Sequence, residues 1–239
     1  MKGIEMKPKR QIDFENSIEV VYTVLKHLTP EDKEQIAAHS ACIFLPKGKM
    51  VYREGETPNH LICLVSGQVK VFKEGIAGRD WIARMFNSAE LLGYRALFGE
   101  ENYNVSAQTI QDSIICRIEK ETVFSIMKSN YSLVFEIMKM LARELGFVHA
   151  KTITLTQKHI RGRLAETLLF LEQTYGMEED NMTLKVRLSR EDLASLSNMT
   201  TSNAIRTLSA FNVEKLVELD GRKIKLLDRK ALEQISQIG

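Results

Sequence analysis

The segment from Leu188 to Asp228 constrains the fold of this chain most, because its helix-start and turn signals all fall in register. Residues 189–192 read S-x-x-D, a capping box in which Ser189 accepts from a free helical N–H and the acid complements the helix dipole. Asn198 follows one short helix later, where a sharp turn requires the positive φ that Asn tolerates. Thr200 then caps a second helix, whose expected apolar positions are Ala204, Ile205, Leu208 and Phe211.

A predicted hairpin follows directly. Residues 216–219 and 223–227 are short β-like runs on either side of Asp220-Gly221, which is a strong signal for a tight turn. Helix, turn, polar helix and basic-edged hairpin form the layout of a winged helix-turn-helix, in which the second helix enters the DNA major groove. We therefore expect double-stranded DNA as a partner.

The charge of the chain gives little support of its own to a nucleic-acid partner. The net charge is only +2, and residues 157–239 hold 13 Lys and Arg against 12 Asp and Glu. A DNA-binding function therefore depends on where the cations lie, and Arg190, Arg206, Arg222 and Lys223 are the candidates. No segment approaches the ~18 consecutive apolar residues of a membrane span, and the basic start lacks the apolar run of a signal peptide. We expect a cytoplasmic protein without membrane contact.

The three cysteines, Cys42, Cys63 and Cys116, each lie inside an apolar run, and no C-x-x-C pair occurs. An odd number of cysteines in such surroundings predicts buried, reduced thiols.

The first half of the chain reads as a β domain. The first eleven residues are polar and basic and are expected to be frayed. Helices are expected at 17–27, after the Thr29-Pro30 cap, and at 119–129. Between about 41 and 118, runs rich in Val, Ile, Phe and Tyr alternate with glycine-bearing turns, including Gly75 through Gly78. This texture is typical of an antiparallel β roll or barrel.

A long helix is predicted over 131–156, with apolar positions at spacings of three and four through about six turns. We expect it to pair with the same helix of a second copy, forming a homodimer; the alternative is a helix packed wholly on its own β roll. The predicted seam consists of Val134, Ile137, Leu141, Leu145, Val148, Thr152 and Leu155. The predicted fold class is α+β: a β-roll domain (1–129, a cupin-like jelly roll), a dimerisation helix (130–156) and a winged helix-turn-helix (157–239).

This order of parts resembles the Crp/Fnr family of bacterial transcription regulators. The similarity covers essentially Leu28 to Asp228, and three segments carry it: 54–71 resembles the family's paired strands, 161–169 the start of its DNA-binding domain, and 188–206 its helix-turn-helix. The resemblance implies a homodimeric regulator on a near-palindromic operator, with half-sites about 34 Å apart. It also implies RNA polymerase as a further partner.

The resemblance assigns roles along the second helix. Arg206 is expected to read a guanine edge, and Thr201, Ser202 and Asn203 lie where family members vary their reading. Many members carry a glutamate at the Ser202 position, so the family's familiar operator is not implied. Phosphate contacts are expected from Arg190, Thr200 and Arg222.

The chain departs from the family in its effector region. Members that bind cyclic nucleotides hold the ribose and phosphate with a Gly-Glu and an Arg-Ser pair, but here Tyr94 follows Gly93 and the second pair falls near Tyr103-Asn104. A phosphate would meet Glu100 and Glu101 with no guanidinium to pair it. Cyclic AMP is therefore not expected. The candidate effector pocket consists of Tyr94, Phe98, Tyr103, Asn104, Val148 and His149.

The sequence also bears on other cofactors and on other functions. An iron–sulfur cluster is not expected, because the first 41 residues hold no cysteine. Haem is left open through His149 or His60, and an unknown small-molecule effector is possible, although no cofactor is predicted. No catalytic motif occurs, so an enzyme is not expected. The alternative function is a sensing module that regulates a protein partner without binding DNA.

Overall fold

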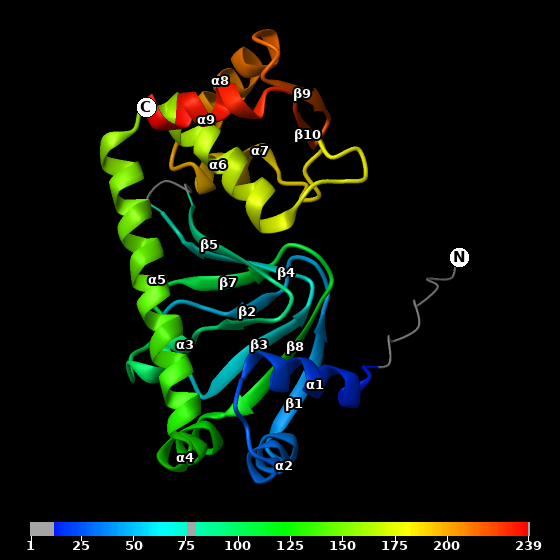
Figure 1. The fold of residues 1–239 in the computed structure, drawn as a ribbon, viewed down its shortest axis with the longest axis vertical. Helices are drawn as coiled ribbons and strands as arrows, with labels where there is room; N and C mark the ends of the chain where they lie inside the picture. Colours follow the sequence, from blue (N-terminus) through cyan, green and yellow to red (C-terminus); the bar gives the residue numbers. More distant parts are fainter. Residues whose placement is uncertain (1–11, 76–79, 239) are drawn as a thin grey trace, which may run out of the picture. The chain divides into compact units, whose positions relative to one another are not determined.

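The computed structural model describes residues 12–75 and 80–238 of the chain (Figure 1). The first eleven residues, which were expected to be frayed, and part of the expected Gly75–Gly78 turn lie outside these residues. The chain forms two compact units, one made of residues up to 71 together with 85–140, the other of 72–84 together with 141–239. The second unit thus includes part of one sheet and half of the long helix as well as the predicted winged helix-turn-helix.

Two four-stranded sheets form the β roll that the sequence predicts (Figure 1). The first has the order β1 (Ser40–Leu45), β8 (Ser113–Glu119), β3 (His60–Ser66), β6 (Glu90–Leu92). The second has the order β2 (Met50–Tyr52), β7 (Ser106–Thr109), β4 (Gln68–Lys73), β5 (Trp81–Asn87). Fully buried apolar side chains such as Leu61, Leu64 and Ile115 form its core, which is where the burial of apolar surface stabilises the fold.

Four helices flank the roll: α1 (Phe14–Val24), α2 (Pro30–Ala38), α3 (Tyr94–Phe98) and α4 (Lys120–Ser129). The Thr29 cap is confirmed as a full capping box with Asp32, and Asp32 also accepts from Asn130 Nδ2 at 2.7 Å. The first helix begins three residues earlier than predicted. Helix α3 was not predicted, because five residues are too few to show a helical period.

The cysteine prediction is wrong in part. Cys42 and Cys116 are disulfide-bonded, and only Cys63 is a free thiol. The cause is register: Cys42 pairs with Cys116 across β1 and β8, with a Cα–Cα distance of 4.0 Å, although 74 residues separate them in sequence. Cys63 stands opposite Cys116 on the other neighbouring strand, and burial raises the pKa of its thiol to about 12.

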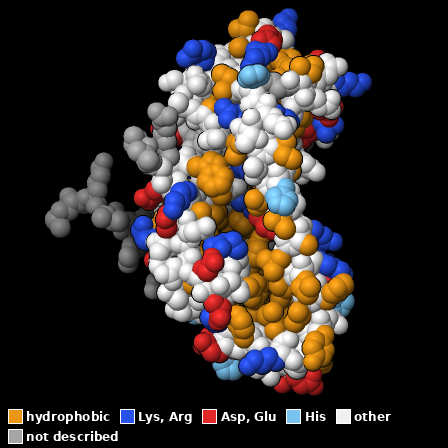
Figure 2. All heavy atoms as spheres, turned by 90° about the vertical axis from the view of Figure 1, so that its left-hand side faces the viewer, with side chains coloured by type: hydrophobic (Ala, Val, Ile, Leu, Met, Phe, Trp, Pro, Cys, Tyr) orange, Lys and Arg blue, Asp and Glu red, His pale blue; other side chains and the backbone are white. Residues whose placement is uncertain are grey.

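The long helix α5 (Tyr131–Gln157) matches the prediction, but the open face differs from the predicted seam. Ile137 is buried within its own chain, as is Leu133, which corrects the placement of Ile137 in the seam. Val134, Leu141 and Leu155 are only partly exposed, whereas Leu145, Val148 and Thr152 are exposed. The fully exposed row has alternating spacings of four and three: Tyr131, Phe135, Met138, Ala142, Leu145, His149, Thr152 and Thr156. Figure 2 turns this side toward the viewer and shows hydrophobic side chains gathered on it.

The second unit holds α6 (Ile160–Tyr175), α7 (Arg190–Leu196), α8 (Thr201–Val213), the β9 (Val217–Asp220) and β10 (Lys223–Leu226) hairpin, and α9 (Arg229–Ile238). Helix α5 ends at Gln157 and α6 begins at Ile160, so the chain breaks between the two helices. The core of the second unit includes the fully buried side chains of Leu164, Leu168 and Phe211. Among the described residues, no helix is long and apolar enough to cross a membrane.

Candidate DNA-binding interface and effector region

The turn between α7 and α8 has the geometry that its residues predict. Ser189 Oγ accepts from the backbone N–H of Asp192 at 3.0 Å, which caps α7. Asn198 adopts φ 50°, and the backbone N–H of Met199 donates to the Ala194 carbonyl at 3.0 Å, closing the turn. The left-handed residue thus allows α8 to start immediately after α7 ends.

Helix α8 has one buried and one open face. Thr200 Oγ1 caps it by accepting from the N–H of Asn203 at 3.2 Å. Ala204, Leu208 and Phe211 are buried as predicted, but Ile205 is 47% exposed and its expected place in the core is wrong. Thr207 is buried instead. It lies three and four residues from 204 and 211, on the same side of the helix as the buried residues, whereas position 205 lies on another side.

The open face combines a cation, hydroxyls and one apolar group. Ser202, Ile205, Arg206 and Ser209 are exposed, and they repeat at spacings of three and four along one side of α8. Thr201 and Asn203 are partly exposed beside them. No ion pair involves Arg206 among the residues that the structure describes. Sequence reasoning missed Ile205 and Ser209, although their spacing from Ser202 already placed them on this face.

The wing is the predicted two-stranded hairpin, but Asp220 ends β9 opposite Lys223, so the turn consists of Gly221 and the exposed Arg222 and not of Asp220-Gly221. Arg190 is tied to it, since its Nη2 donates to the Gly221 carbonyl at 2.9 Å. Burial lowers the pKa of Arg190, and its Nη1 is buried without a hydrogen-bond partner in the part of the chain that the structure describes. Arg190, which was expected to contact a DNA phosphate, therefore connects α7 with the wing.

A further contact fixes α8 against α6, and sequence reasoning did not find it. Arg161 donates to both carboxylate oxygens of Glu214, at 2.8 and 2.7 Å, and its guanidinium lies 4.9 Å from the ring centre of Phe211. Glu214 is the C-terminal cap of α8, where an unpaired carboxylate would oppose the helix dipole. Arg161 compensates that charge.

Two residues of the candidate effector pocket, Tyr94 and Tyr103, have buried side chains. The Tyr103 ring stacks on Tyr52 with 3.9 Å between ring centres, and both side chains are buried, as is Tyr94. A Cβ at Gly93 would lie 2.8 Å from the Tyr103 ring, so the ring packs directly on the glycine backbone. Burial raises the pKa of Tyr103 to about 12, and the nearby Arg117 opposes that rise.

The cations in this region are already engaged. Arg95 Nη1 lies 2.7 Å from Glu101 Oε2 in an ion pair. Arg117 is a cation that the sequence reasoning overlooked; it lies on β8, and its Nη2 donates to the Val51 carbonyl at 3.4 Å.

The other residues of the candidate effector pocket are less enclosed. Phe98 packs against Phe124, with ring centres 6.1 Å apart, and Asn104 is exposed. Val148 and His149 are both exposed on α5, and His149 belongs to the open row of that helix. His60, the other histidine considered as a haem ligand, is partly buried on β3.

Comparison with known proteins identifies both parts of the chain. Residues 42–130 match the family described as "Cyclic nucleotide-binding domain", and residues 162–235 match the family described as "Crp-like helix-turn-helix domain".

Similar curated proteins are regulators. The "Anaerobic regulatory protein" of Bacillus subtilis is 26% identical over 178 residues, covering 74% of this chain and 75% of that protein. The "CRP-like cAMP-activated global transcriptional regulator" of Mycobacterium tuberculosis is 24% identical over 189 residues, covering 78% of this chain and 84% of that protein. Among solved structures, FixK2 from Bradyrhizobium japonicum has a TM-score of 0.73 at 20% identity and covers 82% of this chain and 96% of its own. That likeness supports the fold.

Proposed function

This chain belongs to the Crp/Fnr family of transcriptional regulators, and on that premise we propose that it recognises a specific double-stranded DNA sequence as a homodimer. The observation that carries the proposal is the open face of α8. It presents an arginine without an ion pair among the described residues, surrounded by short hydrogen-bonding side chains, on a helix that follows a tight turn.

The chemistry of that face suits base edges in the major groove. Arg206 is assigned to a guanine, whose O6 and N7 accept two hydrogen bonds from one guanidinium. Ile205 is assigned to a thymine methyl group, since an exposed apolar side chain on a reading helix makes favourable contact with it. Thr201, Ser202 and Asn203 supply shorter polar contacts from the first turn of α8.

Phosphate contacts fix the register of a protein on the duplex. Arg222 in the wing turn and the hydroxyl of Thr200 are assigned to phosphates, because Arg222 is exposed and the Thr200 hydroxyl, although its oxygen accepts from Asn203, still has a hydrogen to donate. Arg190 is assigned to holding the wing through Gly221.

The homodimer is assigned to the open row of α5. Apolar Phe135, Met138 and Leu145 at spacings of three and seven residues fit a two-helix seam. We also propose RNA polymerase as a protein partner and the bacterial cytoplasm as the site of action, both by analogy with the family.

Two features of the chain bear on the effector of the β roll. The stacked tyrosines and the paired Arg95 argue against cyclic AMP, and the lack of cysteines in the first 41 residues argues against an iron–sulfur cluster. We propose that any effector of the roll is neither of these.

Selection of binding sites from a random DNA pool, followed by titration at several salt concentrations, tests the DNA-binding function. The expected result is one enriched near-palindromic sequence, with log affinity falling linearly as log salt rises. Arg222→Ala should lower that slope by about one while keeping the sequence preference. An unenriched pool and no affinity for DNA at low salt would instead favour the alternative, a module that regulates a protein partner.

A further inference from the structure

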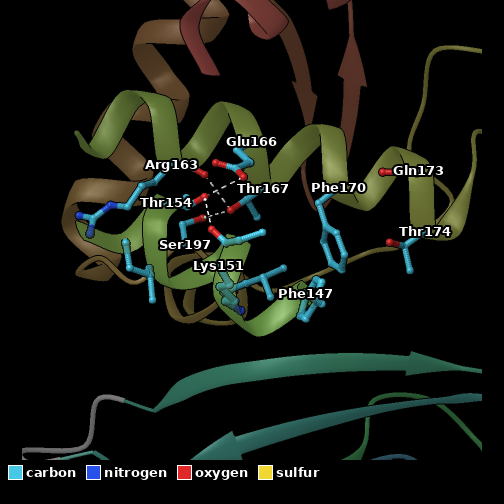
Figure 3. Close-up of a pocket in the computed structure, with 13 residues that line it drawn as sticks. Phe147, Lys151, Thr154, Arg163, Glu166, Thr167, Phe170, Gln173, Thr174 and Ser197 are labelled. Carbon is cyan, nitrogen blue, oxygen red and sulfur yellow. Dashed lines mark hydrogen bonds between the residues drawn. The ribbon is translucent and has the colours of Figure 1, made fainter. Parts of the chain in front are cut away.

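The second unit contains a cavity of about 500 Å³ that the proposed DNA-binding function does not use (Figure 3). Three helices enclose it: the last turns of α5, most of α6, and the C-terminal end of α7. Its volume lies in the range of sites for small organic molecules. The cavity is separate from the Tyr94–Tyr103 region, since none of those residues lines it.

One part of the cavity is apolar and aromatic. Phe147 from α5 and Phe170 from α6 face each other with ring centres 6.0 Å apart, and Leu155 and Leu196 extend the apolar wall. Figure 3 shows the two rings at one side of the space, with Gln173 and Thr174 beyond them. Offset or tilted aromatic pairs of this kind bind flat apolar groups well.

Hydroxyl groups also line the cavity. Ser197 Oγ is 3.0 Å from Thr167 Oγ1, and Thr167 Oγ1 donates to the Arg163 carbonyl at 2.8 Å. Both side chains are buried, and they add polar groups to the lining of the cavity.

Three charged side chains line the cavity, and they differ in whether they have partners within the protein. Glu166 is neutralised, since it accepts from Lys158 at 2.8 Å and from Thr154 at 2.9 Å. Lys151 lines the cavity with its methylene chain, while its ammonium donates to the Ile82 and Ala83 carbonyls at 3.1 and 2.9 Å. Burial lowers the pKa of Lys151 to about 8.

Arg163 differs from Glu166 and Lys151, because its Nε is buried and has no hydrogen-bond partner among residues 12–75 and 80–238. No ion pair involves Arg163 within the described ranges, and it lies at the margin of the cavity opposite the aromatic rings (Figure 3). A buried donor without an acceptor is costly, and a charged guanidinium near an apolar space favours an anion.

We propose that this cavity binds a small carboxylate with an aromatic body, whose ring packs on Phe147 and Phe170 and whose carboxylate accepts from Arg163. Such a molecule supplies the acceptor that Arg163 Nε lacks and fills the apolar part of the cavity. Because it contacts α5, α6 and α7 at once, it would stiffen the connection between the long helix and the helices that precede α8. The proposal goes beyond DNA recognition and does not require it.

Calorimetric titration of the full-length protein without DNA tests the site, with naphthalene-2-carboxylate as the probe and naphthalene-2-carboxamide as its neutral counterpart. The expected result is saturable binding of the carboxylate, at least about tenfold tighter than that of the carboxamide, the ratio that a charged hydrogen bond confers. Arg163→Gln should abolish this preference while leaving the affinity for the carboxamide nearly unchanged.

A second variant tests the location. Ala150 lines the cavity and is exposed, so Ala150→Trp should obstruct the space and remove binding of both probes without unfolding the helix. Arg143→Trp is the matched control, since Arg143 is exposed on the same helix and does not line the cavity. Circular dichroism and the melting temperature establish that the variants are folded.

Three results would overturn the proposal: no saturable binding at millimolar probe, equal binding by the folded Ala150→Trp protein, or a carboxylate preference that survives Arg163→Gln. If Ala150→Trp fails to fold, the comparison of the two probes on Arg163→Gln still decides. Failure of DNA binding in the separate selection experiment has no bearing on these outcomes.

Discussion

Arg161 and Glu214 join the first turn of α6 to the C-terminal cap of α8 through two hydrogen bonds of 2.8 and 2.7 Å. The contact sets the orientation of the proposed reading helix at the end opposite its first turn. A two-point contact between guanidinium and carboxylate is geometrically specific even where, as here, both groups are partly exposed to water.

Glu214→Gln should therefore change stability only slightly, by about 0.2–1 kcal/mol, because solvent screens exposed ion pairs. The Arg161 hydrogen bonds and charge lower the pKa of Glu214 in the folded protein. A lowered folded-state pKa stabilises the protein above the unfolded value of about 4.3 and ceases to do so as the pH falls through the folded value. Urea denaturation should show the stabilities of wild type and variant converging as the pH falls through the lowered pKa of Glu214, whereas a constant difference across pH would contradict this account.

Arg206→Ala should cost on the order of 1–3 kcal/mol of binding free energy at one base pair and relax the preference there. The measurement is a binding titration against the selected site and its single-base variants. Arg187→Ala is the control, since Arg187 pairs with Glu178 at 3.2 Å and is not on the α8 face. Full affinity and an unchanged preference in the Arg206 variant would show that the reading face is assigned incorrectly.

Ile205→Ser should weaken binding most at a single A·T pair, because the substitution removes apolar contact with a thymine methyl group. Replacing that thymine by uracil should reproduce the loss in wild type and add nothing in the variant. If uracil costs both proteins equally, Ile205 does not contact that methyl group.

Phe135→Glu combined with Leu145→Glu should produce folded monomers, since both side chains lie on the open row of α5 and like charges would face each other across the seam. Sedimentation velocity measures the mass, and Val213→Glu, at an exposed site on α8, should leave it unchanged. Ile137→Glu should instead unfold the protein, because Ile137 is buried within its own chain. A dimer that persists in the double variant would refute the seam.

Cys42→Ser should lower the free energy of unfolding by about 2–4 kcal/mol, as expected for loss of a crosslink that closes a long loop. Reductant should destabilise the wild-type protein by a similar amount and leave the variant unaffected. Alkylation in denaturant without reductant should label one cysteine, Cys63, as measured by intact mass. Labelling of all three would mean that the thiols are reduced.

Local sequence determined much of this molecule. Capping residues such as Thr29, Ser189 and Thr200, together with Asn198 in the turn, fix helix ends through contacts within three or four residues, and each prediction made from them is confirmed. The presence of the hairpin was likewise readable from Asp220-Gly221, although its turn lies one residue later than expected, at Gly221 and Arg222. Such features are readable because all the interacting groups are neighbours in the chain.

Only the tertiary structure decided which distant residues meet and which side chains stay exposed to solvent. Cys42 meets Cys116 through strand pairing across 74 residues, and Ile137 turns inward while Phe135 turns outward on the same helix. Apolar spacing alone cannot tell these faces apart, because a helix with apolar residues on two sides gives two equally good stripes. Arg190 bound to Gly221, and Arg163 left without an acceptor, are likewise consequences of packing between elements distant in sequence.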